Sequence, residues 1–268
     1  MKKIKLNFFC IDNIFPSTSG SLNVSKYIHW TEDGSGEANF YFSQNSLDAL
    51  NDRSGKPTFI WLLESKEIIP YQYKWIINNY DFVSDKVDGI FSCDKDLCNE
   101  YPKITYTISN AVPWVQDKKI HKKNKLVSMI SSNKTMCEGH KIRLKFVKKF
   151  GDKVDLFGRG FNTIQHKEEG LKDYMFSIAI QNTVYDTYFT EILTDCFATG
   201  TIPIFYGSRG VIEYFNEDGI IFLDENFDFS SLTQDLYFSK IDAIKENFER
   251  AISFPCAEDW LYENFFLK

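Results

Sequence analysis

The chain alternates between short apolar runs and longer polar or helical segments. The apolar runs seldom alternate with polar positions, which is typical of strands buried on both faces of a parallel sheet. An open parallel α/β sheet is therefore the predicted fold of the first half. The runs of that half cover residues 4–10, 39–42, 58–63, 89–92 and 104–108.

Residues 174–208 carry the clearest strand–helix–strand pattern. An apolar run (176–180) leads through a polar break to a segment with apolar residues at helical spacing (188–199), and a second apolar run (201–206) follows. Ligands of parallel units lie at the carboxyl ends of the strands, and the amides of a helix start favour anions such as phosphate. The polar loop and the helix start, residues 182–191, are therefore expected to face a binding crevice.

A second set of apolar runs starts at residue 126, so we predict two domains, residues 1–124 and 125–268. Between them, residues 113–125 hold five lysines from position 118 onward. Contact with an anionic acceptor is one interpretation of these lysines, but charge runs usually face solvent, which favours a solvated linker. The elements expected beyond it are strands at 126–130, 154–157, 176–180, 201–206 and 220–223 and helices at 140–150, 168–174, 188–199 and 232–252.

Composition excludes several classes of protein. Of the 268 residues, 43% are hydrophobic, which supplies packed cores and argues against disorder. The net charge of -6 leaves no excess that would attract nucleic acid. The N-terminal apolar run is too short for a secretory signal, no stretch reaches the length of a membrane span, and the six scattered cysteines suggest no metal site. These features favour a cytoplasmic protein.

Three motifs of the second half stand in a recognisable order. They are Phe-x-Ile-Ala-x-x-Asn from Phe176, Tyr-x-Thr-Glu from Tyr188, and Asp-Cys-x-x-x-Gly-Thr-x-Pro-Ile-x-x-Gly-Ser from Asp195. This order resembles the donor-binding signature of the family 10 glycosyltransferases, the α1,3-fucosyltransferases. The chain departs from that signature at Gln181, where the family has Glu, and at Ile192, where it has Lys.

The resemblance implies two Rossmann-like domains in tandem, the GT-B architecture. It also implies a GDP-fucose donor bound by the second half, a glycan acceptor bound by the first, inversion of the anomeric centre, and no obligatory metal. Composition and periodicity alone support only an α/β fold, and nothing in the sequence fixes guanine or fucose.

Four residues of the second half match donor-binding positions. Arg143 follows Ser-Asn in an element that resembles the family's pyrophosphate-binding Arg, although an Arg on a basic helix is usually solvated. Glu191 resembles the family Glu that holds the ribose. Its alternative role is structural, since a carboxylate in the first turn of a helix interacts favourably with the helix dipole. Asn182 and Tyr188 would reach phosphate or sugar, but a buried Tyr is often structural.

Ile192 removes a cation from beside the expected diphosphate. The remaining charge would have to come from Arg143, the helix amides, and Arg159 or Lys172. Loss of one charged contact costs about 1.5–3 kcal/mol, or one to two powers of ten in rate. Ile192 therefore motivates an alternative, a catalytically silent module that binds a nucleotide sugar or a glycan. A third interpretation keeps the fold and the reaction with another nucleotide-sugar donor.

A strand in the first half ends in carboxylates. Glu64 is the first candidate for the general base that takes the acceptor's proton, and Glu67 is the second. The position resembles the family's Gly-Glu strand end, with Leu63 in place of Gly, although a strand-end Glu is more often solvated. Asp94 and Asp96 have the DxD spacing of metal-dependent transferases, but such pairs are common on surfaces, so we assign them no metal.

Overall fold

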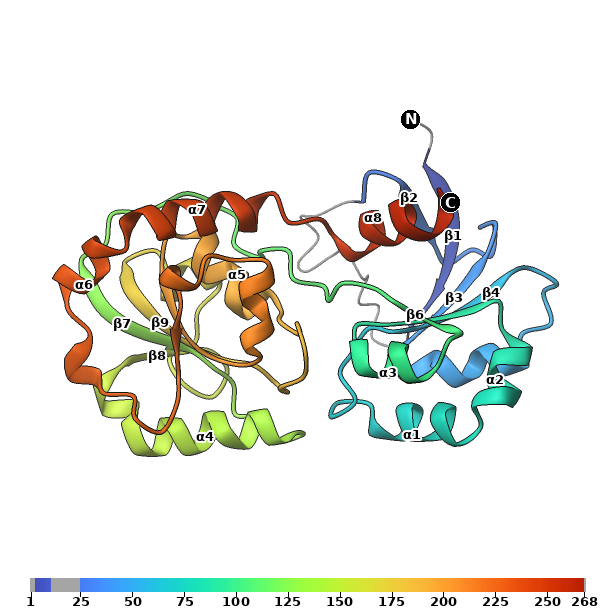
Figure 1. The fold of residues 1–268 in the computed structure, drawn as a ribbon, viewed down its shortest axis with the longest axis horizontal. Helices are drawn as coiled ribbons and strands as arrows, with labels where there is room; N and C mark the ends of the chain where they lie inside the picture. The colour runs from blue at the N-terminus through green and yellow to red at the C-terminus, as the bar shows by residue number, and fades with distance from the viewer. Residues whose placement is uncertain (1–2, 11–24, 268) are drawn as a thin grey trace. The chain divides into compact units, whose positions relative to one another are not determined.

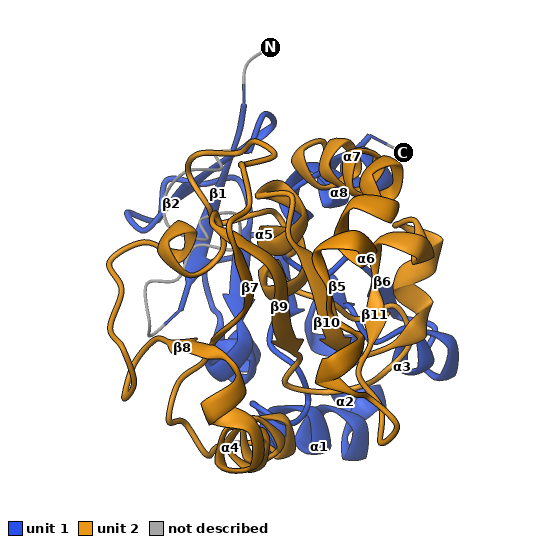
Figure 2. Ribbon diagram, turned by 90° about the vertical axis from the view of Figure 1, so that its left-hand side faces the viewer, with its two compact units in different colours: residues 1–110, 255–268 blue, residues 111–254 orange. Residues whose placement is uncertain are grey.

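The computed structural model describes residues 3–10 and 25–267, which form two compact units (Figures 1 and 2). Unit 1 comprises residues 1–110 and 255–268, and unit 2 comprises residues 111–254. Each unit is an α/β layer structure built on its own parallel sheet, so the predicted fold class is confirmed. No helix of the described part is both long and apolar enough to cross a membrane.

The sheet of unit 1 has six strands in the order β2-β1-β3-β4-β5-β6, and every neighbouring pair is parallel. All five apolar runs predicted there are strands. The sequence analysis missed β2, an edge strand in which only Ile28 is fully buried and which therefore lacks a continuous apolar run. The strands are β1 (Ile4–Phe9), β2 (Ile28–Thr31), β3 (Asn39–Phe42), β4 (Thr58–Leu62), β5 (Gly89–Ser92) and β6 (Ile104–Tyr106).

Helices cover both faces of this sheet, and the last of them returns from the end of the chain. The Phe265 ring meets the Phe91 ring edge-on at 4.9 Å, and Asp259 accepts a hydrogen bond of 2.6 Å from the Ser25 hydroxyl. The predicted second domain, 125–268, is therefore wrong at its end, because the aromatic C-terminus packs on the sheet of unit 1. These helices are η1 (Ser43–Asn51), α1 (Pro70–Asn78), α2 (Tyr80–Lys86), α3 (Lys95–Glu100), α8 (Ala257–Leu261) and η7 (Tyr262–Phe266).

The five-stranded sheet of unit 2 has the order β11-β10-β9-β7-β8, again with parallel neighbours throughout. The strands are β7 (Lys125–Ile130), β8 (Asp155–Phe157), β9 (Tyr174–Ile180), β10 (Ile202–Tyr206) and β11 (Ile221–Phe222). The main helices are α4 (Glu138–Phe150), α5 (Glu191–Ala198), α6 (Gln234–Ser239) and α7 (Ile241–Ile252). Short helical turns are η2 (Gly151–Lys153), η3 (Lys167–Gly170), η4 (Arg209–Glu213), η5 (Glu217–Gly219) and η6 (Phe229–Ser231).

Strand order places a crevice at the carboxyl ends of β7 and β9. The chain runs from β7 outward to β8 and then returns to the other side of β7 with β9, so the connections leave these two strands in opposite directions. Such a topological switch point is where doubly wound sheets bind ligands. All seven residues of β9 are buried, which explains the apolar run that the sequence shows there.

Three predicted helices of unit 2 differ in their bounds, and the one expected at 232–252 is broken into α6 and α7 at Lys240. The helix expected from residue 188 begins at Glu191, because Thr190 is its N-cap and its hydroxyl accepts from the Ile192 N–H at 3.4 Å. Tyr188 therefore precedes the helix. The helix expected at 168–174 is the shorter η3, because β9 already starts at Tyr174.

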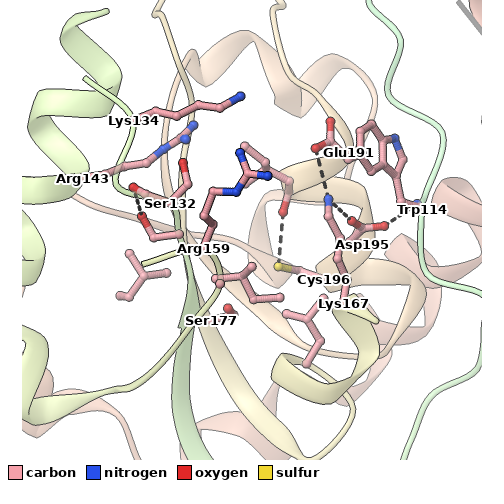
Figure 3. A pocket seen from close by; sticks show the side chains of 16 residues that line it. Trp114, Ser132, Lys134, Arg143, Arg159, Lys167, Ser177, Glu191, Asp195 and Cys196 are labelled. Carbon is pink, nitrogen blue, oxygen red and sulfur yellow. Dashed lines mark hydrogen bonds and ion pairs between the residues drawn. The ribbon is translucent and has the colours of Figure 1, made fainter. Parts of the chain in front are cut away.

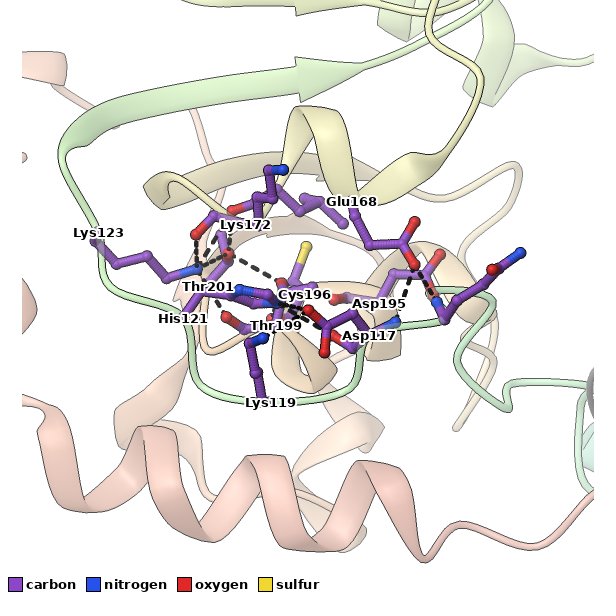
Figure 4. Close-up of polar contacts among 12 residues, drawn as sticks. Asp117, Lys119, His121, Lys123, Glu168, Lys172, Asp195, Cys196, Thr199 and Thr201 are labelled. Atoms are coloured by element: carbon purple, nitrogen blue, oxygen red, sulfur yellow. Dashed lines mark hydrogen bonds and ion pairs between the residues drawn. The ribbon is translucent and has the colours of Figure 1, made fainter.

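Residues 111–124, which we call the strap, belong to unit 2. Lys119 and Lys122 are exposed, as expected of a solvated segment, but Lys123 is not. Lys123 is only 8% exposed, and its ammonium donates to four oxygens (Figure 4). The acceptors are the carbonyls of Leu171 (3.2 Å), Lys172 (3.1 Å) and Thr199 (2.7 Å) and the Thr201 hydroxyl (2.9 Å). The lysine-rich composition of the segment therefore did not indicate this buried contact. The boundary between the two units lies at residues 110 and 111 rather than at 124.

The other end of the strap is fixed as well. The Thr194 hydroxyl donates to the Ala111 carbonyl at 2.6 Å, and the Asp195 carboxylate accepts from the Val115 N–H at 3.0 Å. Ala111 and Val115 are both fully buried. The strap therefore ties α5 to the rest of unit 2 at both ends.

We predict that Lys123→Met lowers the free energy of unfolding by about 1–3 kcal/mol, because it leaves buried carbonyls without their donor. Lys122→Met is the matched control, since Lys122 is exposed and should change stability by less than about 0.5 kcal/mol. Urea denaturation of the three proteins measures the difference. Equal midpoints for both variants would show that the strap does not stabilise unit 2.

Candidate functional site

A pocket of about 520 Å³ opens at the switch point of unit 2 (Figure 3). Its volume is in the range of small-molecule sites. Residues from the ends of β7 and β8, from α4, η3 and α5, and from the strap line it. They are Trp114, Ile130, Ser131, Ser132, Lys134, Arg143, Gly158, Arg159, Lys167, Leu171, Ser177, Ile178, Glu191, Ile192, Asp195 and Cys196.

Three cations, Lys134, Arg143 and Arg159, lie together on one side of the pocket, which we call the cationic wall (Figure 3). Lys134 lies in the loop after β7, Arg143 on α4, and Arg159 in the turn after β8. That turn needs glycine, because Gly158 has φ +108° and a side chain there would meet the Ser131 carbonyl. The two strand ends therefore pack closely and hold Arg159 beside the loop that carries Lys134.

Arg143 is fixed by the end of β9. Its Nε donates to the Ile180 carbonyl at 2.8 Å, and its Nη2 donates to Oδ1 of Asn182 at 2.6 Å. Burial lowers the pKa of Arg143, and the nearby Glu191 carboxylate opposes that shift, so the guanidinium remains charged at neutral pH. Arg143 is only 8% exposed, so it is not the solvated helix residue that composition alone would favour.

The opposite side of the pocket, which we call the carboxylate wall, holds Glu191, Asp195, Lys167 and Trp114 (Figure 3). The Lys167 Nζ lies 3.1 Å from Oε1 of Glu191 and 2.8 Å from Oδ2 of Asp195. Burial disfavours the ammonium, but the two carboxylates outweigh it and raise the pKa of Lys167. Burial raises the pKa of Asp195, and Lys167 opposes that shift. This wall therefore holds one lysine that bonds to both Glu191 and Asp195.

The structure brings most of the predicted donor residues together. Arg143, Arg159 and Glu191 line the pocket, and Asn182 contacts it through its bond to Arg143. Tyr188 is buried with its ring 4.7 Å from that of Tyr185, so its contact with a ligand stays a prediction.

Lys172 and Ile192 differ in whether they line the pocket. Lys172 is exposed and does not line the pocket, and its carbonyl accepts from Lys123 of the strap. Its expected side-chain contact with the donor is therefore not supported by the geometry. Ile192 does line the pocket, so the lysine missing from the motif is missing from the site itself.

The two candidate bases lie in unit 1, just after β4. The backbone of Glu64 is held at both ends, since its N–H donates to the Ser43 hydroxyl and its carbonyl accepts from the Tyr73 hydroxyl, each at 3.2 Å. The Oε2 atom of Glu67 is buried and has no hydrogen-bond partner among the described residues. The catalytic roles of both carboxylates stay predictions.

Asp94 has a structural role in unit 1. It caps α3 by accepting from the Leu97 N–H at 3.2 Å, and it pairs with Lys66 at 3.0 Å. These contacts use the carboxylate that the DxD spacing had marked as a possible metal ligand.

Sequence reasoning missed four residues of the pocket, namely Trp114, Lys134, Lys167 and Asp195. Signals existed for two of them, because Lys134 directly follows the Ser-Asn pair of the motif and Asp195 lies one helical turn after Glu191. Lys167 and Trp114 come from segments far from α5 in the sequence, and only the fold brings them to it.

Comparison with known proteins agrees with the motifs. A model of the C-terminal part of glycosyltransferase family 10 (fucosyltransferase) matches residues 120–250. Among curated proteins, the alpha-(1,3)-fucosyltransferase FucT of Helicobacter pylori is 35% identical over 71 residues, which are 26% of this chain and 15% of that protein. The match therefore spans a small part of that relative's length. Together, the family model and this relative confirm the resemblance inferred from the sequence.

Solved structures show the same fold over nearly the whole chain. An alpha1,3-fucosyltransferase with GDP is 14% identical, with a TM-score of 0.50, and the match covers 95% of this chain and 82% of that one. Another alpha1,3-fucosyltransferase structure is 13% identical with a TM-score of 0.51, covering 92% and 80%. At this identity the likeness concerns the fold, and it confirms the GT-B-like pair of Rossmann-like units.

The cationic wall predicts binding of a diphosphate group. Calorimetry should show that inorganic pyrophosphate binds the wild-type chain and that Arg143→Gln and Arg159→Gln each weaken it by about tenfold or more, the effect of one charged hydrogen bond. Arg159 is exposed, so its loss should leave the fold intact.

Arg209→Gln is the control for this measurement. Arg209 is paired with Glu217 at 2.9 Å and does not line the pocket, so its loss should not change the affinity. If all three variants bound pyrophosphate as the wild type does, the cationic wall would not be a phosphate site.

Proposed function

We propose that the chain is a glycosyltransferase that transfers fucose from GDP-fucose to a hydroxyl of a glycan, a proposal supported by the match of residues 120–250 to the C-terminal model of glycosyltransferase family 10. The observation that supports this proposal most is that one pocket at the switch point has a cationic wall on one side and a carboxylate wall on the other. A nucleotide sugar has matching parts, an anionic diphosphate and a ribose whose hydroxyls donate hydrogen bonds.

Lys134, Arg143 and Arg159 would receive the diphosphate. Negative charge grows on this group as its bond to the sugar breaks, and fixed cations in a partly dry site stabilise that charge. The cation lost at Ile192 is offset in this account by Lys134 and Arg159, which face the same pocket from other elements. Since protein side chains supply the charge, we propose that the reaction needs no metal ion.

Glu191 would hold the ribose. It is the first residue of α5, and its side chain is 17% exposed toward the pocket, where a carboxylate oxygen can accept from a ribose hydroxyl. Asn182, which accepts a hydrogen bond from Arg143, would contact the phosphate or the sugar of the donor.

Glu64 would act as general base in a single displacement. The acceptor hydroxyl gives its proton to Glu64 while its oxygen attacks the anomeric carbon, and the bond from that carbon to the diphosphate oxygen breaks. GDP leaves, and the configuration at the anomeric carbon inverts. The position of Glu64 at the carboxyl end of a buried strand supports this role, and Glu67 is the second choice.

Ile192 favours a second candidate function. An apolar side chain stands in the pocket where the family motif carries a cation, so a module that binds a nucleotide sugar without turning it over would have the same fold. The remaining alternative is transfer of a different sugar from another nucleotide.

Donor turnover separates these functions. Without an acceptor, the purified chain should slowly release GDP from GDP-fucose, at a rate unchanged by EDTA, and should leave UDP-galactose intact. Binding of GDP-fucose without any release would indicate the silent module. Release of UDP alone would indicate another donor, and a rate that EDTA abolishes would contradict the metal-free mechanism.

Glu64→Gln should lower kcat for fucose transfer by about 10²–10⁴-fold, the usual contribution of a general base, while the affinity for GDP-fucose stays the same. Glu67→Gln is the matched control and should keep most of the activity. NMR of the product should show the anomeric configuration opposite to that of the donor. Full activity of Glu64→Gln with loss in Glu67→Gln would assign the base to Glu67, and retention would exclude a single displacement.

A further inference from the structure

The Lys167 ammonium is the central contact of the carboxylate wall. It bonds to Glu191 at 3.1 Å and to Asp195 at 2.8 Å, and it lies 4.4 Å from the centre of the Trp114 ring. Its side chain is 26% exposed and lines the pocket. One cation thus joins two carboxylates and an aromatic ring from α5 and the strap.

The two carboxylates that Lys167 joins are not equivalent. The Asp195 side chain is 2% exposed, and its Oδ1 also accepts from the backbone N–H groups of Trp114 and Val115. Both of its oxygens therefore accept hydrogen bonds from the protein, and Asp195 holds the strap. Glu191 is 17% exposed and faces the pocket, so it is the carboxylate that remains available.

Without Lys167, Glu191 would lose its fixed orientation. Glu191 and Asp195 lie four residues apart on α5, where two like charges repel each other. The Glu191 carboxylate would then move away from Asp195 toward the cations of the opposite wall, which line the same pocket. Such a shift would also neutralise part of the cationic wall.

The backbone that carries Lys167 is rigid. The Glu169 carboxylate accepts from the backbone N–H groups of Gln165 and His166 at 2.9 and 2.8 Å and so caps η3. The Glu168 carboxylate accepts from the Asp117 N–H of the strap at 3.2 Å (Figure 4). Lys167 therefore reaches α5 from an element that is held on both sides.

We propose that Lys167 is a positioning residue that fixes the Glu191 carboxylate for the ribose diol of the nucleotide and keeps it away from the cationic wall. This inference rests on the proposed donor site. One oxygen of Glu191 is bonded to Lys167, and the rest of the carboxylate is left to accept from the ribose hydroxyls. Lys167 thus separates the ribose contact from the diphosphate contact within one pocket.

The test compares the binding of GDP, 2′,3′-dideoxy-GDP and pyrophosphate by calorimetry. Lys167→Met keeps the length of the side chain but loses its charge, and Lys167→Arg keeps the charge. Wild type should prefer GDP to dideoxy-GDP by on the order of tenfold or more, because the diol bonds to a carboxylate. In Lys167→Met this preference should disappear, and pyrophosphate should bind more weakly because Glu191 is free to shift toward the cationic wall.

Lys167→Arg should retain the preference for GDP, and Lys172→Met, which removes an exposed lysine outside the pocket, should behave as the wild type. A Lys167→Met protein that still prefers GDP as the wild type does would overturn the inference. An equal loss for GDP and dideoxy-GDP, with the preference intact, would also overturn it, because a purely structural role predicts that result. If wild type bound none of the three compounds, the proposed donor site itself would fail.

Discussion

The parallel pairing of β7 with β9 is the constraint on which unit 2 depends. It places the loop after β7, the end of β9 and the start of α5 at one edge of the sheet, and it creates the switch point. Arg143 then joins α4 to that edge through the Ile180 carbonyl and the Asn182 side chain. The pocket at this edge receives charged groups from α4, η3, α5 and the loops after β7 and β8, and an aromatic ring from the strap.

The pocket holds cations on one side and carboxylates on the other. This arrangement adds little to the stability of the fold but prepares the pocket to bind a ligand. Cations on one wall are not paired with the carboxylates of the other, because Lys167 already bonds to Glu191 and Asp195. Buried ion pairs seldom add net stability, since desolvation offsets their attraction. In this pocket the ion pairs of Lys167 preorganise the side chains, because each wall can bind one part of a nucleotide without first moving.

The fold was largely predictable because its strands are buried on both faces, as the seven buried residues of β9 show. The exposed edge strand β2 and the return of the C-terminus to unit 1 were not, since β2 lacks a continuous apolar run and the return depends on ring packing such as that of Phe265 on Phe91. Lysine-rich composition misled us about the strap, where Lys123 is buried among four oxygens.

The motifs pointed to Arg143 and Glu191, and both line the pocket. Glu191 ends the Tyr-x-Thr-Glu motif, and Arg143 follows Ser-Asn at a distance that the motif does not fix. The motifs could not locate Lys167, which lies 24 residues from Glu191 in sequence and meets it only in the folded chain. The motifs also showed that Ile192 removes a charge, but only the folded chain shows that Lys134 and Arg159 line the same pocket.

We propose that one pocket of unit 2 binds the two parts of a nucleoside diphosphate on opposite walls. A crystal structure of the chain with GDP would show where the nucleotide lies. We expect the diphosphate within hydrogen-bond distance of Arg143 and the ribose hydroxyls at Glu191, with Lys167 still bonded to that carboxylate. GDP bound outside this pocket, or bound with its ribose at the cationic wall, would contradict it.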